Sequence, residues 1–156
     1  MLKVTRRSLA LSLFALCVAA LAAAPATRAQ DKDKENEPPF REYKGVRLGM
    51  AADEARKLLG NPADKDDRQD FYSFSDSETA QIFYDAQKKV YAISVVYIGA
   101  GASVPSAKSV LGSEIEAKPD GSMHQRLDFP KARCWVAYSR TSGDAPLITI
   151  TLQKKE

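Results

Sequence analysis

The chain has 156 residues and carries 23 Lys and Arg against 20 Asp and Glu, a formal net charge of +3. Residues 1–29 hold four of the bases and no acid, so the remaining 127 residues have 19 bases and 20 acids, a net charge of about −1. This balance excludes a strongly basic surface as the basis for binding nucleic acid or anionic lipid.

Residues 1–29 have the layout of an export signal. A basic start with Lys3, Arg6 and Arg7 precedes an apolar run over residues 9–21, and small residues lead up to Ala29. The apolar run is too short to cross a membrane comfortably, and no second such stretch follows. We therefore expect cleavage after Ala29 and a periplasmic or secreted protein without stable membrane insertion. A retained membrane anchor is the alternative.

Two features bear on the export route. Paired Arg6 and Arg7, with Arg28 near the cleavage site, also fit a twin-arginine signal, so the route stays open. Cys17 is preceded by Leu16, whereas a lipid-attachment site needs a small residue directly before the cysteine. We therefore expect no lipoprotein.

Residues 30–42, QDKDKENEPPFRE, are charged and almost free of apolar side chains, so they cannot offset the entropy of ordering. We expect a flexible charged linker there, followed by a single domain over residues 43–156. Removal of Cys17 with the signal leaves Cys134 alone, which excludes an intramolecular disulfide. Cys134 is expected to be buried and inert, with a redox thiol as the alternative.

An amphipathic helix is predicted between Gly45 and Pro62. Small and apolar residues recur at helical spacing over residues 51–59, with charged residues on the other side. Gly60 suits the left-handed residue after the last turn, and Pro62 prevents continuation. The start is weak because Ala51 stands where a capping side chain is preferred, a deficit of about 1 kcal/mol.

This stretch recurs later in the chain. Residues 46–60 placed over residues 98–112 give four identities, one of which is Gly60 with Gly112. A second helix is therefore expected, capped by Ser103 and with Pro105 in its first turn. Chance similarity between two alanine-rich helices is the alternative to an internal repeat.

The stretch after the first helix is acidic and contains Asp64, Asp66, Asp67 and Asp70. It departs from a calcium-binding loop because Arg68 takes a ligand position, and the glycine turn and the distal glutamate are missing. We expect a solvated acidic loop.

From Phe71 onward, aromatic and β-branched residues alternate with polar ones in segments separated by turn-forming residues. Six strands are predicted, over residues 69–75, 79–86, 89–97, 122–129, 133–140 and 146–153. Their short connections imply antiparallel pairing. We expect an α+β domain with one sheet and both helices on one face, built as two tandem helix-plus-three-strand repeats over residues 45–97 and 98–153.

Three motifs carry a resemblance to a known family: GVRLGM at residues 45–50, LGNP at residues 59–62 and IFYD at residues 82–85. They resemble the SmpA/OmlA family, whose members include a small lipoprotein of the outer-membrane β-barrel assembly machinery. The duplicated plan also resembles the β-lactamase-inhibitory protein fold, which has two tandem copies of such a unit. The resemblance covers residues 43–97, and the second half only through the repeat, and it implies fold more than activity. The chain departs from the family at Ala51, where a capping hydroxyl is usual, and in lacking an acceptable lipid-attachment cysteine.

Catalytic and metal-binding patterns are not evident in the sequence. His124 is the only histidine, and neither Cys134 nor the carboxylates stand at a recognisable ligand spacing from it. Ser122, His124 and Asp128 alternate along one predicted strand, where side chains two apart are separated by about 7 Å and cannot converge on a reacting atom. We therefore expect no enzyme, no catalytic residues, no metal and no cofactor.

Candidate binding residues lie on the sheet face away from the helices, which an antiparallel sheet can leave open to a partner. Alternation along the fourth and fifth predicted strands places Trp135, His124 and Arg126 on one surface, joined by Phe83 through the repeat. This composition is typical of binding hot spots. A core position for Trp135 is the alternative, and the third strand is ambiguous because the set beginning with Tyr91 is bulkier than the set between its members.

The sequence thus predicts an exported, non-enzymatic protein-binding module of the cell envelope that uses the open face of its sheet. Its partner would be an envelope or secreted protein, not nucleic acid, and the sequence does not identify it. One alternative is a periplasmic domain that binds a small ligand or peptide, which a pocket enclosed between sheet and helices would favour. An enzyme with a site that the sequence does not reveal is a further alternative.

Overall fold

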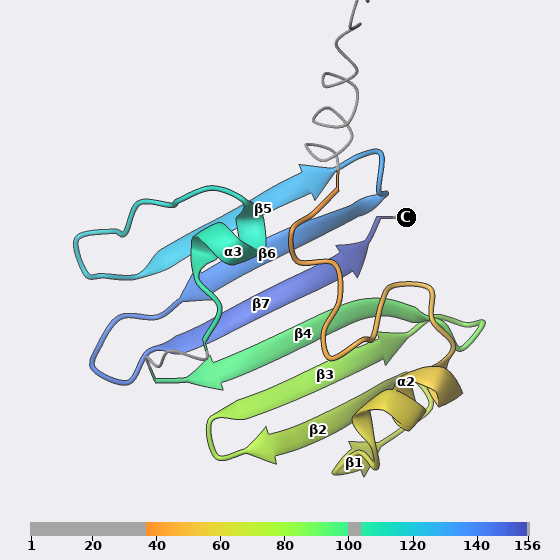
Figure 1. The fold of residues 1–156 in the computed structure, drawn as a ribbon. Helices are drawn as coiled ribbons and strands as arrows, with labels where there is room; N and C mark the ends of the chain where they lie inside the picture. Colours follow the sequence, from red (N-terminus) through yellow and green to blue (C-terminus); the bar gives the residue numbers. More distant parts are fainter. Residues whose placement is uncertain (1–36, 100–103, 156) are drawn as a thin grey trace, which may run out of the picture.

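The computed structural model describes residues 37–99 and 104–155, which form an antiparallel sheet and two helices (Figure 1). In chain order, the elements are α2 (Ala52–Leu59), β1 (Asp64–Lys65), β2 (Gln69–Ser75), β3 (Glu78–Tyr84), β4 (Val90–Ile98), α3 (Ala107–Leu111), β5 (Met123–Phe129), β6 (Cys134–Arg140) and β7 (Leu147–Lys154). The strands lie in the order β1-β2-β3-β4-β7-β6-β5, and all neighbours are antiparallel. The predicted signal and most of the predicted linker lie outside the described residues.

The α+β class is confirmed, with seven strands instead of the six predicted. Each predicted strand is present, and its bounds differ from the prediction by two residues at most. The additional strand, β1, has two residues and pairs with Asp70 and Phe71 of β2. Two residues are too few to show an alternating pattern, so periodicity could not identify this strand.

Both helices and the N-terminal segment, residues 37–51, lie in front of the sheet in Figure 1. There, α2 lies against the β1–β2 side, α3 lies against the β5–β6 side, and residues 37–51 cross between them. The covered face carries the core, to which Val46 of the segment contributes along with Ile82, Ile93 and Ile150 of the sheet, all fully buried. We call the opposite face of the sheet the open face.

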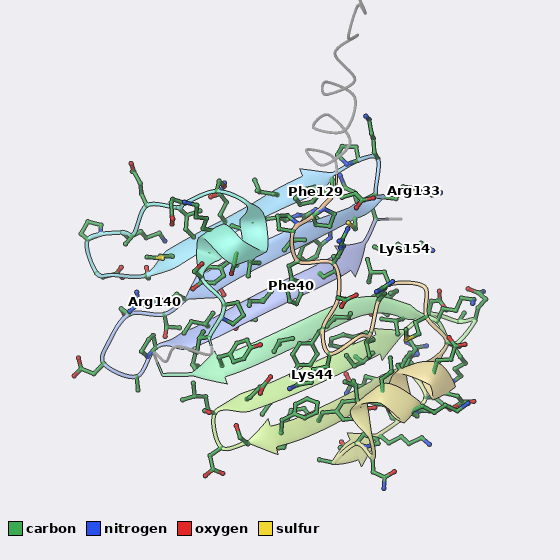
Figure 2. The ribbon with its side chains drawn as sticks, viewed as in Figure 1. Phe40, Lys44, Phe129, Arg133, Arg140 and Lys154 are labelled. Atoms are coloured by element: carbon green, nitrogen blue, oxygen red, sulfur yellow. The ribbon has the colours of Figure 1, made fainter. Side chains whose placement is uncertain are left out.

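Ordered contacts begin before the predicted domain start at residue 43. Pro38 is buried, and the backbone N–H of Phe40 donates to the carbonyl of Val110 in α3 over 3.3 Å. Phe40 packs against the core and lies over the middle of the sheet (Figure 2). The last residues of the predicted linker, from Glu37 onward, therefore help to cover the sheet.

Both helices end at the expected glycines, but two details of their caps differ from the prediction. Gly60 and Gly112 are the C-cap residues, and only Gly112 has left-handed αL backbone, with φ of 83° and ψ of −5°, whereas Gly60 has φ of 85° and ψ of −158°. Ser106, and not Ser103, caps α3, since its Oγ accepts the Ser109 N–H over 3.2 Å. Pro105 disfavours helical backbone in the residue before it, so the helix starts after the proline. Neither helix of the described residues is long and apolar enough to cross a membrane.

Asp70 is fully buried, which corrects the prediction that it belongs to a solvated loop. The other three acids of that loop are exposed: Asp64, Asp66 and Asp67. Because β2 begins at Gln69, alternation turns Asp70 toward the covered face. There its carboxylate accepts two hydrogen bonds from Arg56 of α2, over 2.8 Å and 3.0 Å, and one from the Tyr84 hydroxyl over 2.6 Å. This bidentate pair fixes α2 to the sheet.

Candidate functional site

The register of the sheet defines which side chains share the open face. One row across the strands contains Gln69, Phe83, Ala92, Gln153, Trp135 and Asp128, each paired with the next. In β6, Cys134, Val136 and Tyr138 are buried in the core, whereas Trp135 is only partly buried. Trp135 therefore lies on the open face, and the alternative of a core position is wrong.

Trp135 and Arg126 form a direct contact. The guanidinium carbon of Arg126 lies 4.4 Å from the centre of the indole ring, a distance at which the cation is attracted to the ring face. They come together because Asp128 is directly opposite Trp135, and Arg126 lies two residues along the same edge strand. The contact joins a flat apolar surface to a charged group with several hydrogen-bond donors.

Asp128 lies between two cations at one end of this contact. Its carboxylate oxygens are 3.3 Å from Arg126 Nη2 and 3.2 Å from Lys155 Nζ. The hydrogen bond from Lys155, aided by Arg126, lowers the pKa of Asp128. Arg133 and Lys154 lie at the same end of the sheet (Figure 2), but Lys154 is opposite Cys134 and so belongs to the covered side. With Arg126 and Lys155 against Asp128, this end of the open face carries more basic than acidic groups around Trp135.

Phe83 lies in the same row as Trp135 but is separated from it by β4 and β7, a distance of about 14 Å at normal strand spacing. Its nearest aromatic neighbour is Tyr91, with ring centres 6.1 Å apart. The pairing skips a residue here: Phe83 is opposite Ala92 and Tyr84 is opposite Val90, so Tyr91 lies in a bulge. The bulge lets Tyr91 contact Phe83 while Ile93 and the bulky residues after it face the core, which resolves the ambiguity of this strand.

Two hollows meet at Tyr91. One, of about 510 Å³, is lined on the sheet by Gln69 and Phe83, and the other, of about 330 Å³, by Gln153 and Lys155. Tyr91, Asp128, Gln153 and Lys155 were not among the predicted site residues. Lys155 and Gln153 could have been found from the register opposite Trp135. Tyr91 could not, because the hydropathy pattern of the sequence does not reveal the bulge in which it lies.

His124 shares the open face and is exposed, but it lies far from the indole. It pairs with Ser139, four residues along β5 from Asp128, which corresponds to about 13 Å. The structure thus brings Arg126 to Trp135 and leaves Phe83 and His124 elsewhere on the same face. The predicted set shares a surface without forming one contiguous cluster.

The remaining candidate groups have no arrangement typical of catalysis. Among residues 37–99 and 104–155, no group of three His, Cys, Asp or Glu side chains could hold a metal ion. Cys134 is buried, and the loss of solvation raises its pKa, so its thiol stays protonated at neutral pH. Ser122 and His124 lie at the start of β5 with Asp128 near its end.

A third hollow lies on the covered face. It measures about 880 Å³ and is lined by residues 37–42 together with Val110 of α3, Cys134 and Leu152. It is open to solvent, and its rim carries the ion pairs Arg41–Glu37 and Arg47–Glu42, with distances of 2.8 Å and 2.6 Å. This hollow is therefore not the enclosed pocket that would favour a small apolar ligand.

The described residues thus form an α+β domain whose sheet has one covered face and one open face. Comparison with known proteins finds no match to a family model, to a curated protein or to a solved structure.

Proposed function

We propose that this chain is an exported, non-enzymatic module of the cell envelope that binds another protein through the open face of its sheet. The observation that carries the proposal is Trp135, a partly exposed indole on β6, next to the edge strand β5, with Arg126 stacked over its ring. Tryptophan and arginine are enriched in binding hot spots. A rigid strand holds them in place, so little conformational entropy would be lost on binding.

The basic groups around Trp135 favour a partner segment that combines apolar and acidic residues. Arg126 offers a planar set of donors that matches a carboxylate, and Lys155 lies 3.2 Å from Asp128 at the same end of the face. The neutral remainder of the face, with Gln81, Ser94 and Thr151 in the next row, suits hydrogen bonds to a partner's backbone.

An internal duplication is part of this proposal. The first unit is α2 with β2, β3 and β4, the second is α3 with β5, β6 and β7, and the two meet where β4 pairs with β7. Gly60 and Gly112 each end a helix with a positive φ, although their ψ angles differ, at −158° and −5°. The proposal includes a SmpA/OmlA-like, β-lactamase-inhibitory-protein-like fold, which the sequence motifs suggest. The helices differ in length, with eight residues in α2 and five in α3.

A capture experiment from envelope extract tests the binding proposal. Because Trp135 is the only tryptophan, its fluorescence reports directly on the open face. A partner should change the emission of the wild type, and Trp135→Ala should weaken capture by about 2 kcal/mol, or roughly 30-fold. Thr149→Ala, on the same face but two rows away, should bind as the wild type does. Equal capture by Trp135→Ala and the wild type would remove this face from the proposal.

A second candidate function is binding of a small ligand or peptide in the hollow beneath residues 37–42. The observation in its favour is the mixed lining of this hollow, with apolar Val110 and Leu152 below a charged rim. Ser109→Trp would fill it from α3 without touching the open face. Loss of a copurified small molecule in Ser109→Trp, with capture of proteins unchanged, would support this candidate over the open face.

A further inference from the structure

The two edges of the sheet differ in how they are covered. At one edge, the outer side of β2 is paired by β1, and the N–H groups of Ala63 and Asp66 donate to the carbonyls of Phe71 and Gln69 over 2.8 Å and 2.9 Å. At the other edge, β5 has no neighbour on its outer side among the described strands over its seven residues. An unpaired edge of this length is a template for another strand.

Hydrogen bonds at the ends of β6 determine which groups of β5 face outward. Lys155 N–H donates to the Arg133 carbonyl over 2.7 Å, and Thr141 N–H donates to the Leu147 carbonyl over 2.9 Å. In an antiparallel ladder, hydrogen bonds placed in this way lie next to a non-hydrogen-bonded pair. Cys134–Lys154 and Arg140–Ile148 are therefore non-hydrogen-bonded pairs between β6 and β7. The even-numbered residues of β6 therefore bond to β5 and not to β7.

The partners of those residues in β5 are Met123, Gln125, Leu127 and Phe129, whose backbone groups point inward. It follows that His124, Arg126 and Asp128 direct their N–H and C=O groups away from the sheet. Ser122 agrees with this parity, since its carbonyl accepts the Lys118 N–H over 2.8 Å on the outer side. No backbone hydrogen bond among the described residues uses the outward groups of these three residues.

The side chains of β5 are complementary to a second, antiparallel copy of the same strand. With Leu127 as the centre of a two-fold axis, Arg126 of each copy lies opposite Asp128 of the other, and both residues have outward backbone groups. Leu127, which is partly exposed, lies opposite its own copy on the covered side. A register centred on Arg126 would instead bring two guanidinium groups face to face, which is unfavourable.

We propose that two copies of this chain pair edge to edge through β5, centred on Leu127, to form one continuous sheet. Opposite residues in hydrogen-bonded pairs have Cα atoms about 5.5 Å apart, so Arg126 can reach the partner's Asp128 without leaving the indole of Trp135. The side chains of Arg126 and Asp128 are 50% and 47% exposed, which leaves room for the second carboxylate and guanidinium. Pairing would join the two open faces into one surface carrying both Trp135 sites.

Sedimentation equilibrium of the protein, purified as cells process it, tests the pairing. A strand-edge interface is small, so we expect reversible dimers with a dissociation constant on the order of 10 µM. Arg126→Asp would place acid against acid, and Asp128→Arg would place base against base, so each variant should dimerise at least about 10-fold more weakly. An equimolar mixture of the two variants should recover dimers, because every changed charge then faces its opposite. Arg68→Asp makes the same charge reversal near the opposite edge and should dimerise as the wild type does.

Hydrogen exchange gives a second readout. The amides of Arg126 and Asp128 should exchange more slowly as protein concentration rises, while that of Ser73 should not change. A protein that stays monomeric up to about 1 mM would overturn the proposal, as would dimers indifferent to both charge reversals or a mixture that stays monomeric. Protection of these amides only by an added extract, without dimers, would assign the edge to a different strand and equally overturn it. These measurements need no binding partner, so their failure would leave the open-face proposal untouched.

Discussion

Asp70 illustrates how a single residue can determine where a helix lies. Its carboxylate is fully buried and accepts hydrogen bonds from Arg56 and Tyr84. The negative charge is therefore paired with a positive one and hydrogen-bonded within the protein. Removing one member of such a pair leaves the other charge without a partner, which costs far more than the net contribution of the pair.

We expect Asp70→Asn to lower the free energy of unfolding by about 3 kcal/mol, measured by urea denaturation. Asp67→Asn is the matched control, because Asp67 pairs with Lys88 over 2.8 Å on the surface, where such pairs contribute about 0–1 kcal/mol. Equal effects of the two substitutions would contradict a structural role for the buried pair.

Trp135 should behave as a surface residue in unfolding experiments. Its truncation removes a partly exposed ring and the contact with Arg126, so we expect Trp135→Ala to lower the free energy of unfolding by only about 1 kcal/mol. Tyr138→Ala, on the buried side of the same strand, should lose about 3 kcal/mol or more. If Trp135→Ala lowers the free energy of unfolding as much as Tyr138→Ala does, the indole would be part of the hydrophobic core.

The buried tyrosines predict an alkaline transition. Loss of solvation raises the pKa of Tyr72 and Tyr97 from 10.0 to about 12, and burial raises the pKa of Tyr43, Tyr84 and Tyr138 as well. A pKa that is higher in the folded state means that stability is fully present below about pH 10 and falls as the pH rises toward 12. Tyrosinate absorbance should therefore rise late in the folded protein and together with unfolding, whereas early ionisation of these groups while the fold persists would contradict their burial.

At the scale of elements, the strands were the most predictable feature, because alternation and turn residues mark them along the chain. The β3–β4 turn is an example, since Asp85 accepts hydrogen bonds from the N–H groups of Gln87 and Lys89, both over 2.9 Å. Alternation also placed Trp135 and Arg126 on one face. It could not reveal the bulge at Tyr91 or the burial of Asp70, because both depend on the register with a neighbouring strand and on a contact from α2.

The helix ends provide a prediction at this scale. Gly112 has left-handed αL backbone, with φ of 83° and ψ of −5°, which alanine adopts at a cost of about 1 kcal/mol. Gly60 has φ of 85° and ψ of −158°, a region that is almost confined to glycine, so alanine strains the backbone more there. A side chain at Gly112 would come within 3.2 Å of Pro39, which a small shift of the proline ring relieves, whereas none of the described atoms lies within 4 Å at Gly60. Thermal denaturation should therefore show a larger loss for Gly60→Ala than for Gly112→Ala. A larger loss for Gly112→Ala would contradict this difference in backbone conformation.

At the scale of the whole molecule, the sequence predicted the class of the fold and the positions of the strands along the chain better than it predicted the site. A sheet covered on one face explains the alternation of every strand, since bulky residues such as Ile93 and Val136 face the core and polar ones face outward. Which open-face residues contact one another depends on the order β3-β4-β7-β6-β5, which places Trp135 beside Arg126 and leaves β4 and β7 between Trp135 and Phe83. Strand order is a long-range property that local patterns do not specify.

Export is the last prediction, and it concerns residues 1–29, outside the described part of the chain. Their basic start, apolar run and small residues before Gln30 predict cleavage after Ala29. Intact mass of the protein recovered from the cell envelope should then correspond to a chain beginning at Gln30, with no added acyl group. The variant Ala29→Arg should accumulate uncleaved, because signal peptidases require a small residue before the cleaved bond. A mature form that begins at Cys17 and carries lipid, or a wild type that keeps its signal, would contradict a soluble exported domain.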